Sequence, residues 1–319
     1  LITGASGYVG NNLVRRLVAL GEPVRALVHN PAKAEIRLAD VRDRVEIMRG
    51  DVTQPETLAP ALDGATAVVH LVAVAIEQGN RTYERINTQG TINVVDAAQA
   101  AGVRRFVNMS QNGADSASPF RFLASKGRAQ DYVAASGLDW TALRPSVIWG
   151  PQDEFANVQA RLIKLTPLIF PIVGDGRARF QPVWVGDVVE AAVKCLHDDQ
   201  TIGRELLLGG PEVLTYADIV RRVLVALGAR RLTINVPVAM LRPLGTVLQL
   251  ALPNPPVTTS LLDMLKVDNT VASNALTEVL GIAPRPFTPE NLSYMRDFTA
   301  LGSLRRLLGQ PTADEARAR

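Results

Sequence analysis

Three glycines spaced three residues apart near the start of the chain restrict its fold more than any other feature. The segment TGASGYVG, residues 3–10, follows a short apolar run and opens a helical pattern. Gly4 suits a tight turn, Gly7 lets a phosphate approach the main chain, and Gly10 lets a helix pack closely on a strand. Because the amides at a helix N-terminus attract anions, the segment predicts a site for the diphosphate of a dinucleotide.

The first half of the chain alternates β-rich runs with helical patterns. Strands are expected at residues 1–3, 24–28, 45–48, 67–71, 106–109 and 140–143. Helices are expected at residues 9–20, 56–62, 88–101 and 122–135, where apolar residues recur at helical spacing. Strict alternation implies right-handed crossovers and a parallel sheet covered on both faces. The pattern therefore predicts an α/β fold with a doubly wound parallel sheet, the Rossmann fold.

After Pro145 prolines become frequent, and the alternation of predicted strands and helices is lost until about residue 180. We therefore expect an NAD(P)-binding Rossmann domain at residues 1–150, with residues 180–200 returning to it. A smaller, mostly helical substrate or lid domain is expected at residues 151–319.

Two local patterns are informative within the second half. Capping patterns at Thr215 and Thr288 each predict the start of a helix. The apolar segments 162–173 and 236–252 are predicted to form the core of the lid rather than to dock on a membrane, because Lys and Arg do not line one face there. A roomy apolar lid favours a hydrophobic small molecule as substrate.

Composition excludes several classes of protein. The 47% of apolar residues and 20% of charged residues are typical of a folded globular protein. A net charge of +3 and 5% aromatic residues argue against a nucleic-acid partner. Cys195 is the only cysteine and the three histidines are scattered, so we expect neither an internal disulfide nor a metal site.

The chain starts at Leu1 without a methionine, and we read this as a first strand whose opening residues are missing. Targeting information would be missing with them. The expected location is the cytoplasm, or the inner face of a membrane.

The end of the second predicted strand bears on the choice of nucleotide. An NAD site normally has Asp or Glu there for the ribose 2′-hydroxyl, and this chain has none. His29 and Lys33, with Arg25 nearby, suit a 2′-phosphate instead. NADP(H) is therefore favoured over NAD(H), and the competing interpretation is that His29 and Lys33 are solvated loop residues.

Several further segments resemble one known family, the short-chain dehydrogenase/reductases in their extended and atypical branches, which are NAD-dependent epimerase/dehydratase-like. The matching segments are GDV at 50–52, HLVA at 70–73, INTQGT at 86–91, LRP at 143–145 and VWVGDV at 183–188. RALV at 25–28, GLDWT at 137–141 and LRPSVIWGP at 143–151 make the chain similar to the group that contains the NAD(P)H-binding accessory subunit of respiratory complex I and its bacterial relatives.

The resemblance also implies a catalytic set, which is incomplete here. The family uses Ser, Tyr and Lys, with Tyr four residues before Lys, to exchange a proton while hydride moves to or from the nicotinamide. Ser110 and Lys126 match the serine and the lysine, whereas Phe122 occupies the tyrosine position. Tyr132 lies ten residues beyond Phe122, too far along a helix to replace it, and nothing local argues for Tyr83.

Three functions stay open from the sequence. The first is a protein that binds the dinucleotide and is weakly active or inactive, since a phenyl ring transfers no proton. The second is an active NADPH-dependent reductase, epimerase or dehydratase with another proton donor, acting on a hydrophobic small molecule. The third is an interaction scaffold within a membrane-associated respiratory complex, although the intact glycine segment and Lys126 argue against a pure scaffold.

The candidate site collects residues from the glycine segment and from the ends of the predicted strands. The catalytic-type residues are Ser110 and Lys126. The predicted nucleotide contacts are Gly4, Ser6, Gly7, Tyr8, Gly10, His29, Asp51, Val72, Asn87, Lys126 and Pro145.

Overall fold

The computed structural model of this protein describes residues 1–265 and 267–310. Its contacts divide the chain into two units. The first consists of Leu1–Pro145, Val185–Leu208 and Ala272–Ala283, and the second consists of Ser146–Trp184, Gly209–Val271 and Pro284–Arg319.

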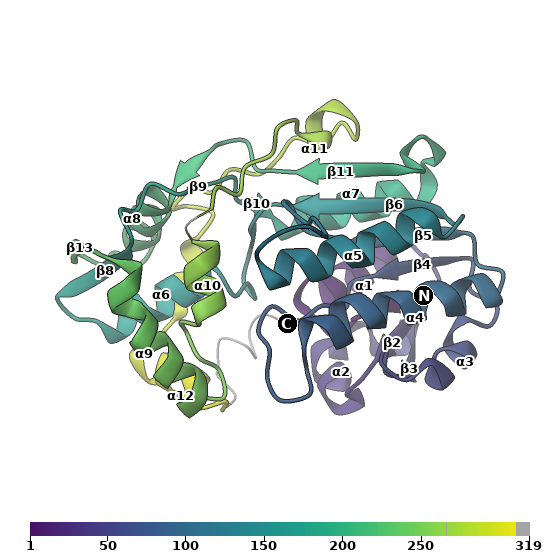
Figure 1. Ribbon diagram of the computed structural model, residues 1–319, viewed down its shortest axis with the longest axis horizontal. Coiled ribbons are helices and arrows are strands. Elements are labelled where there is room, and N and C mark those ends of the chain that lie inside the picture. The colour runs from purple at the N-terminus through teal and green to yellow at the C-terminus, as the bar shows by residue number, and fades with distance from the viewer. Residues whose placement is uncertain (266, 311–319) are drawn as a thin grey trace. The chain divides into compact units, whose positions relative to one another are not determined.

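A seven-stranded sheet forms the centre of the first unit, in the order β11-β6-β5-β4-β1-β2-β3 (Figure 1). Every neighbouring pair of strands is parallel. The strands are β1 (Ile2–Thr3), β2 (Val24–Val28), β3 (Val45–Arg49), β4 (Ala67–His70), β5 (Arg105–Met109), β6 (Asp139–Pro145) and β11 (Arg204–Leu208). The predicted doubly wound sheet is confirmed, and β11, which the alternation did not predict, extends it beyond β6.

Two pairs of helices cover the two faces of this sheet. Helix α1 (Tyr8–Ala19) lies beside α7 (Val185–His197), and α4 (Gly90–Ala100) lies beside α5 (Arg121–Ala135) (Figure 1). Shorter elements complete the unit: α2 (Pro31–Arg37), η1 (Ala39–Arg44), η2 (Pro55–Thr57), α3 (Ala59–Leu62), η3 (Glu84–Gln89), η4 (Asp199–Thr201) and α11 (Ala275–Glu278). The helix predicted at 56–62 is thus split between η2 and α3.

The strand order reverses at β1, because the chain runs outward to β2 and β3 on one side and to β4, β5 and β6 on the other. Connections therefore leave the carboxyl ends of β1 and β4 in opposite directions and open a crevice between them. Ligands of doubly wound sheets bind at such a switch point. The glycine segment follows β1 directly, so the fold places it at this crevice.

The second unit is mostly helical and has small two-stranded sheets. Its helical elements are α6 (Ala156–Leu165), α8 (Tyr216–Ala226), α9 (Val238–Ala251), α10 (Thr259–Met264), η5 (Ser293–Asp297) and α12 (Ala300–Leu307). Its paired strands are β7 (Ile148–Trp149) with β10 (Val183–Trp184), β8 (Ile169–Val173) with β13 (Leu232–Val236), and β9 (Arg179–Phe180) with β12 (Leu214–Thr215). Trp149, Phe170 and Phe287 are the largest side chains fully buried in its core.

One of the two capping predictions holds in this unit and the other is wrong. Thr215 and Asp218 form a capping box at the start of α8. After Thr288 the chain forms turns and the 3-10 helix η5 instead of an α-helix. Leu292, Met295 and Phe298 are all buried. Their spacing of three keeps them on one side of a helix with three residues per turn, which explains why the core selects the tighter helix.

The prediction for the two apolar segments is half right. Ile163, Phe170 and Ile172, from the segment 162–173, belong to the core of the second unit. The segment 236–252 does not, because Gly245 is the one buried residue of α9. That helix is apolar around most of its circumference, and only one side of it meets the protein. In the described part of the chain, no helix combines the length and the apolar character needed to cross a membrane.

Candidate functional site

The turn after β1 brings the start of α1 directly onto the strand. Gly4 has a φ of +72°, and the N–H of Gly7 donates to its carbonyl at 2.8 Å. A Cβ on Gly10 would lie 2.2 Å from the same carbonyl oxygen, so only glycine permits this packing. Ser6 lies within the turn and Tyr8 is the first residue of α1. The N-cap is Gly7 and the first turn holds no acidic residue, so the positive end of the helix is offered to an incoming anion.

A buried histidine joins β4 to β1 beside this turn. The Nδ1 of His70 is 2.8 Å from Thr3 Oγ1, and its Nε2 is 3.0 Å from Thr91 Oγ1. Thr91 donates its hydroxyl hydrogen to the Asn87 carbonyl at 2.7 Å, so Nε2 carries the imidazole proton and Nδ1 accepts from Thr3. Burial, followed by the charge of Lys126, lowers the pKa of His70 to about 3. The ring is therefore neutral at pH 7.

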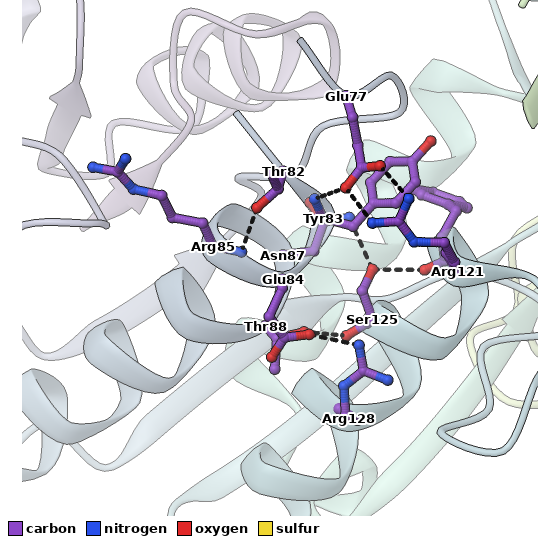
Figure 2. Close-up of polar contacts among 11 residues, drawn as sticks. Glu77, Thr82, Tyr83, Glu84, Arg85, Asn87, Thr88, Arg121, Ser125 and Arg128 are labelled. Atoms are coloured by element: carbon purple, nitrogen blue, oxygen red, sulfur yellow. Dashed lines mark hydrogen bonds and ion pairs between the residues drawn. The ribbon is translucent and has the colours of Figure 1, made fainter. Parts of the chain in front are cut away.

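The side chain of Asn87 supports the loop that follows β4. Its Oδ1 accepts the N–H of Val74 at 2.8 Å, and its Nδ2 donates to the Val74 carbonyl at 3.2 Å. The same Nδ2 donates to Ser125 Oγ at 3.1 Å, and Ser125 donates to the Phe122 carbonyl at 2.7 Å (Figure 2). Asn87 is fully buried. It therefore positions the loop that carries Val72, another of the predicted nucleotide contacts.

The residues predicted at the ends of β2 and β3 contact each other. The Nδ1 of His29 lies 3.2 Å from Asp51 Oδ2, and the His29 side chain is 80% exposed. Lys33 lies in α2 rather than in a loop, and Asn30 caps that helix by accepting the Lys33 N–H at 3.2 Å. His29 and Lys33, the residues predicted to meet a 2′-phosphate, are thus both exposed and lie four residues apart around the start of α2, which we call the corner at His29.

Arg25 does not belong to this corner, contrary to the expectation from the sequence. Its Nε donates to Glu46 at 2.7 Å, and its guanidinium also donates to the carbonyls of Ala61 and Asp63. The register of the sheet is the cause, because it pairs Arg25 with Glu46 on β3, close to the start of both strands.

The two surviving catalytic-type residues lie at neighbouring positions. Lys126, which is buried on α5, donates from Nζ to the Met109 carbonyl at 2.6 Å. Ser110 follows Met109, and its N–H donates to the Leu143 carbonyl at 2.8 Å. Its buried Oγ has no hydrogen-bond partner within the described residues. Burial lowers the pKa of Lys126 to about 8, so its ammonium remains the main form at pH 7.

Phe122, at the position of the family's tyrosine, makes an aromatic contact. The rings of Phe122 and Tyr83 meet edge to face, with centroids 5.6 Å apart. Tyr83 is buried, and its hydroxyl donates to the Ala75 carbonyl at 2.9 Å. Tyr132 donates to Asp96 at 2.6 Å on the exposed side of α5, as its distance along the helix predicted.

A carboxylate clamps the loop over this aromatic pair. Glu77 accepts the main-chain N–H of Tyr83 at 2.9 Å and forms an ion pair with Arg121 at 2.8 Å (Figure 2). The guanidinium of Arg121 also lies 6.0 Å from the centre of the Tyr83 ring. The loop after β4 is thereby fastened to the first turn of α5, where Phe122 lies.

The end of β6 is tied to the loop after β5. The Pro145 carbonyl accepts the N–H of Asn112 at 3.0 Å and the side-chain amide of Gln111 at 3.3 Å. Arg144 donates to the Ala114 carbonyl at 2.7 Å. These contacts hold Ser110 and Pro145 at adjacent strand ends.

Glu77 and Ser125 are structurally important residues that sequence reasoning missed, and Tyr83 is one that it considered but had no local argument to place. Each acts through a partner distant in the sequence, so no local spacing reveals it. The INTQGT segment was the one available signal for Ser125, since it marked Asn87, to which Ser125 is bonded.

Comparison with known proteins agrees with this geometry. The sequence model of a family described as NAD(P)H-binding matches residues 4–163. The mitochondrial NADH dehydrogenase (ubiquinone) 1 alpha subcomplex subunit 9 of Arabidopsis thaliana is 29% identical over 220 residues, which are 67% of this chain and 54% of that protein. This chain therefore spans about half the length of that relative.

Two further comparisons extend the resemblance. The 3 beta-hydroxysteroid dehydrogenase/Delta 5→4-isomerase of Mycobacterium tuberculosis is 28% identical over 268 residues, covering 72% of this chain and 70% of that protein. The solved structure of Thermus thermophilus UDP-glucose 4-epimerase in complex with NAD has a TM-score of 0.70 at 22% identity, covering 93% of this chain and 97% of that one. The latter likeness is one of fold.

Proposed function

Because this chain belongs to the NAD(P)H-binding family, within the extended short-chain dehydrogenase/reductases, we propose that it binds NADP(H) tightly and transfers hydride slowly. The family membership makes a nicotinamide dinucleotide its ligand. Gly4, Gly7 and Gly10 would hold the diphosphate at the start of α1. The preference for NADP(H) and the slow transfer are the parts that need a test.

Three features of the first unit itself are suited to a bound nucleotide: the glycine turn, the uncapped start of α1 and the Ser110 hydroxyl. Glycine at position 10 lets α1 pack directly against the main chain of Gly4, and no side chain caps the start of α1. The buried Ser110 hydroxyl has no partner in the described part of the chain, although burial of an unpaired hydroxyl is unfavourable. A bound nucleotide or its substrate would supply that partner.

Phe122 is the observation on which slow transfer rests. When bound, the nicotinamide supplies a hydride at C4, and the family's tyrosine supplies or removes the matching proton. The ring of Phe122 has no proton to donate. The hydroxyl of its neighbour Tyr83 already donates a hydrogen bond to the Ala75 carbonyl. Lys126 can still hold a ribose through its ammonium. General acid–base help contributes about 10²–10⁴-fold to such rates, so this is the expected loss.

The choice of NADP(H) is supported by the corner at His29. The residues that end β2 and follow it, up to Lys33, include no Asp or Glu of the kind that accepts a ribose 2′-hydroxyl in an NAD site. The exposed imidazole of His29 follows β2 directly and suits a phosphate, and Lys33 follows four residues later in α2. The carboxylate of Asp51 lies 3.2 Å from the His29 imidazole, so it would be a neighbour of any group bound there.

The test is a titration followed by a turnover assay. NADPH and NADH are titrated into the purified chain by nucleotide fluorescence, and nucleotide oxidation is then measured with a quinone as acceptor. We expect tight NADPH binding, slow oxidation by the wild type, and a gain of about 10²-fold or more in Phe122→Tyr.

Phe122→Leu is the matched control, because it changes the same ring without adding a hydroxyl and should gain nothing. Rapid oxidation by the wild type, or an equal rate in Phe122→Tyr, would contradict slow transfer. Tighter binding of NADH than of NADPH would contradict the nucleotide preference.

A second candidate function, an accessory subunit of a membrane-associated respiratory complex, is favoured by the likeness to the Arabidopsis subunit over 67% of this chain. A tagged chain purified from its source in mild detergent should then carry the other subunits of such a complex. Recovery of the chain alone would exclude this role.

A further inference from the structure

Arg49 is the last residue of β3, and the sheet places it beside the end of β2. The parallel register pairs Arg49 with Val28, the last residue of β2. The pairing continues for one more residue, since the N–H of Gly50 donates to the Val28 carbonyl at 3.1 Å. His29 follows Val28 directly. Neighbouring strands lie about 4.8 Å apart, a separation that an arginine side chain can bridge, so Arg49 lies within reach of the corner at His29.

Side chains alternate along β3, and one of them shows to which face Arg49 points. Glu46 forms an ion pair with Arg25 at 2.7 Å, and Arg25 also donates to the carbonyl of Ala61 in α3 at 3.0 Å. Glu46 therefore points to the face of the sheet that α3 covers. Arg49 lies three residues further along the same strand, so its side chain points to the opposite face.

Helix α2 covers that opposite face. Whereas α3 lies beside α4, α2 is tied to α1 on the other side of the sheet, where Arg15 donates to the Arg37 carbonyl at 2.6 Å. Lys33 lies in the first turn of α2. Arg49 and the helix that carries Lys33 therefore share one face, beside the end of β2.

The charge of Arg49 is available to a ligand. Its side chain is exposed, and within residues 1–265 and 267–310 no hydrogen bond or ion pair involves its guanidinium. Residues 31–51 contain five carboxylates, and four of them have other partners. Glu35 pairs with Arg42, Asp40 with Arg15, Glu46 with Arg25, and Asp51 with His29. The fifth, Asp43, precedes β3 and so lies at the opposite end of the strand from Arg49.

The register that removes Arg25 from the corner at His29 is the one that brings Arg49 to it. Arg25 pairs with Glu46 near the amino ends of β2 and β3, and Arg49 lies at their carboxyl ends. Ligands of doubly wound sheets bind outside the carboxyl ends of the strands. The arginine expected near the nucleotide is therefore supplied by β3 instead of β2.

We propose that Arg49 binds the 2′-phosphate of NADP(H) and sets the preference for this nucleotide. The inference rests on the proposed function, because it assumes a dinucleotide on the glycine turn. A guanidinium keeps its charge throughout the physiological pH range, and its planar N–H groups match two oxygens of a phosphate. His29 and Lys33 would assist it. The ribose 2′-hydroxyl of NADH carries no charge, so NADH gains little from this arginine.

The test compares the two nucleotides on Arg49→Gln, which removes the charge and keeps a polar side chain. NADPH and NADH are titrated into the whole chain by nucleotide fluorescence, at low and at high salt. The Kd for NADPH should rise about tenfold or more, and the Kd for NADH should stay unchanged. The salt dependence of NADPH binding should become weaker, because one screened contact is lost. Arg49→Lys, which keeps the charge without the planar fork, should lose less affinity than Arg49→Gln.

Arg44→Gln is the matched control. Arg44 is also exposed and precedes β3, about 16 Å away along the strand, so its loss changes the net charge equally at the wrong end. Its nucleotide affinities should equal those of the wild type. All variants are first checked for unchanged thermal unfolding.

The outcomes separate this inference from the proposed function. If the wild type prefers NADPH and Arg49→Gln keeps that preference, or loses affinity equally for both nucleotides, Arg49 does not read the 2′-phosphate and only this inference is overturned. If the wild type itself prefers NADH, the proposed preference for NADP(H) fails, and the role of Arg49 fails with it.

Discussion

The rings of Phe122 and Tyr83 meet edge to face at 65°, with centroids 5.6 Å apart. The contact joins the start of α5 to the loop after β4, at the position where the family has its proton donor. Phe122 is therefore packed within the site. The ring of Tyr83 gives the ring of Phe122 an apolar surface to pack against, which explains why a phenyl ring fits at this position. Edge-to-face pairs of this kind stabilise by about 1 kcal/mol beyond their burial.

Removal of the Tyr83 hydroxyl should change stability and leave chemistry alone. Tyr83→Phe deletes the hydrogen bond to the Ala75 carbonyl and leaves that oxygen without it, which costs about 1 kcal/mol. Urea unfolding measures this cost, and residual NADPH oxidation should be unchanged. Loss of the residual oxidation would instead identify Tyr83 as the proton donor.

Replacement of Lys126 should stabilise the nucleotide-free protein near neutral pH. Burial lowers the pKa of Lys126 from 10.5 to about 8. The buried ammonium therefore lowers the free energy of unfolding by its full amount below pH 8, and this loss disappears as the pH rises to 10.5. Lys126→Met should therefore raise the free energy of unfolding at pH 7 by about 2 kcal/mol, after loss of the bond to Met109. The gain should vanish near pH 10.5 and should not occur in Lys194→Met, which alters an exposed lysine. Urea unfolding of the wild type and of both variants at pH 7 and at pH 10.5 measures this gain in the free energy of unfolding.

Acid should destabilise the protein through His70. Its folded pKa is about 3 and its unfolded value is 6.5, so the unfolded state binds the extra proton between those pH values. The free energy of unfolding should therefore fall by about 2 kcal/mol from pH 6.5 to pH 5 because of this residue. Unfolding curves of His70→Gln should lack that part of the pH dependence, whereas His197→Gln, at an exposed position, should keep it. Equal slopes in His70→Gln and the wild type would refute the assignment.

Two glycines should differ sharply in their tolerance of a methyl group. Gly10→Ala places a Cβ 2.2 Å from a backbone oxygen, so α1 must shift, at a cost of about 3 kcal/mol and with loss of NADPH binding. Gly102→Ala meets no atom within 4 Å and carries only the penalty of its φ of +72°, about 1 kcal/mol. Thermal unfolding and nucleotide fluorescence compare the two. Normal NADPH binding by Gly10→Ala would mean that the turn is not the diphosphate site.

A single substitution at His29 should change the nucleotide preference. His29→Asp puts a second carboxylate beside Asp51 and removes the imidazole that suits a 2′-phosphate. Affinity for NADPH should fall about tenfold, as repulsion at an exposed site predicts, while affinity for NADH is kept or improved. NADH thus serves as the internal control of the titration. An equal loss for both nucleotides would place His29 outside the phosphate corner.

Local spacing was enough to identify the sheet and the glycine turn. Strand and helix periods and the separation of Gly4, Gly7 and Gly10 are short-range properties, and every strand predicted from them is present. The absence of a tyrosine before Lys126 was equally visible, because the family's spacing lies within one helix.

Long-range packing decided what the sequence left open or suggested wrongly. The partner of Arg25 followed from the register of β2 with β3, and the partner of Phe122 came from the loop after β4, thirty-nine residues earlier. The exposure of α9 is the sharpest case. The sequence shows that the segment is apolar, but an apolar segment can lie in a core or on a surface. Which of the two occurs depends on the neighbouring elements that the tertiary structure places against it.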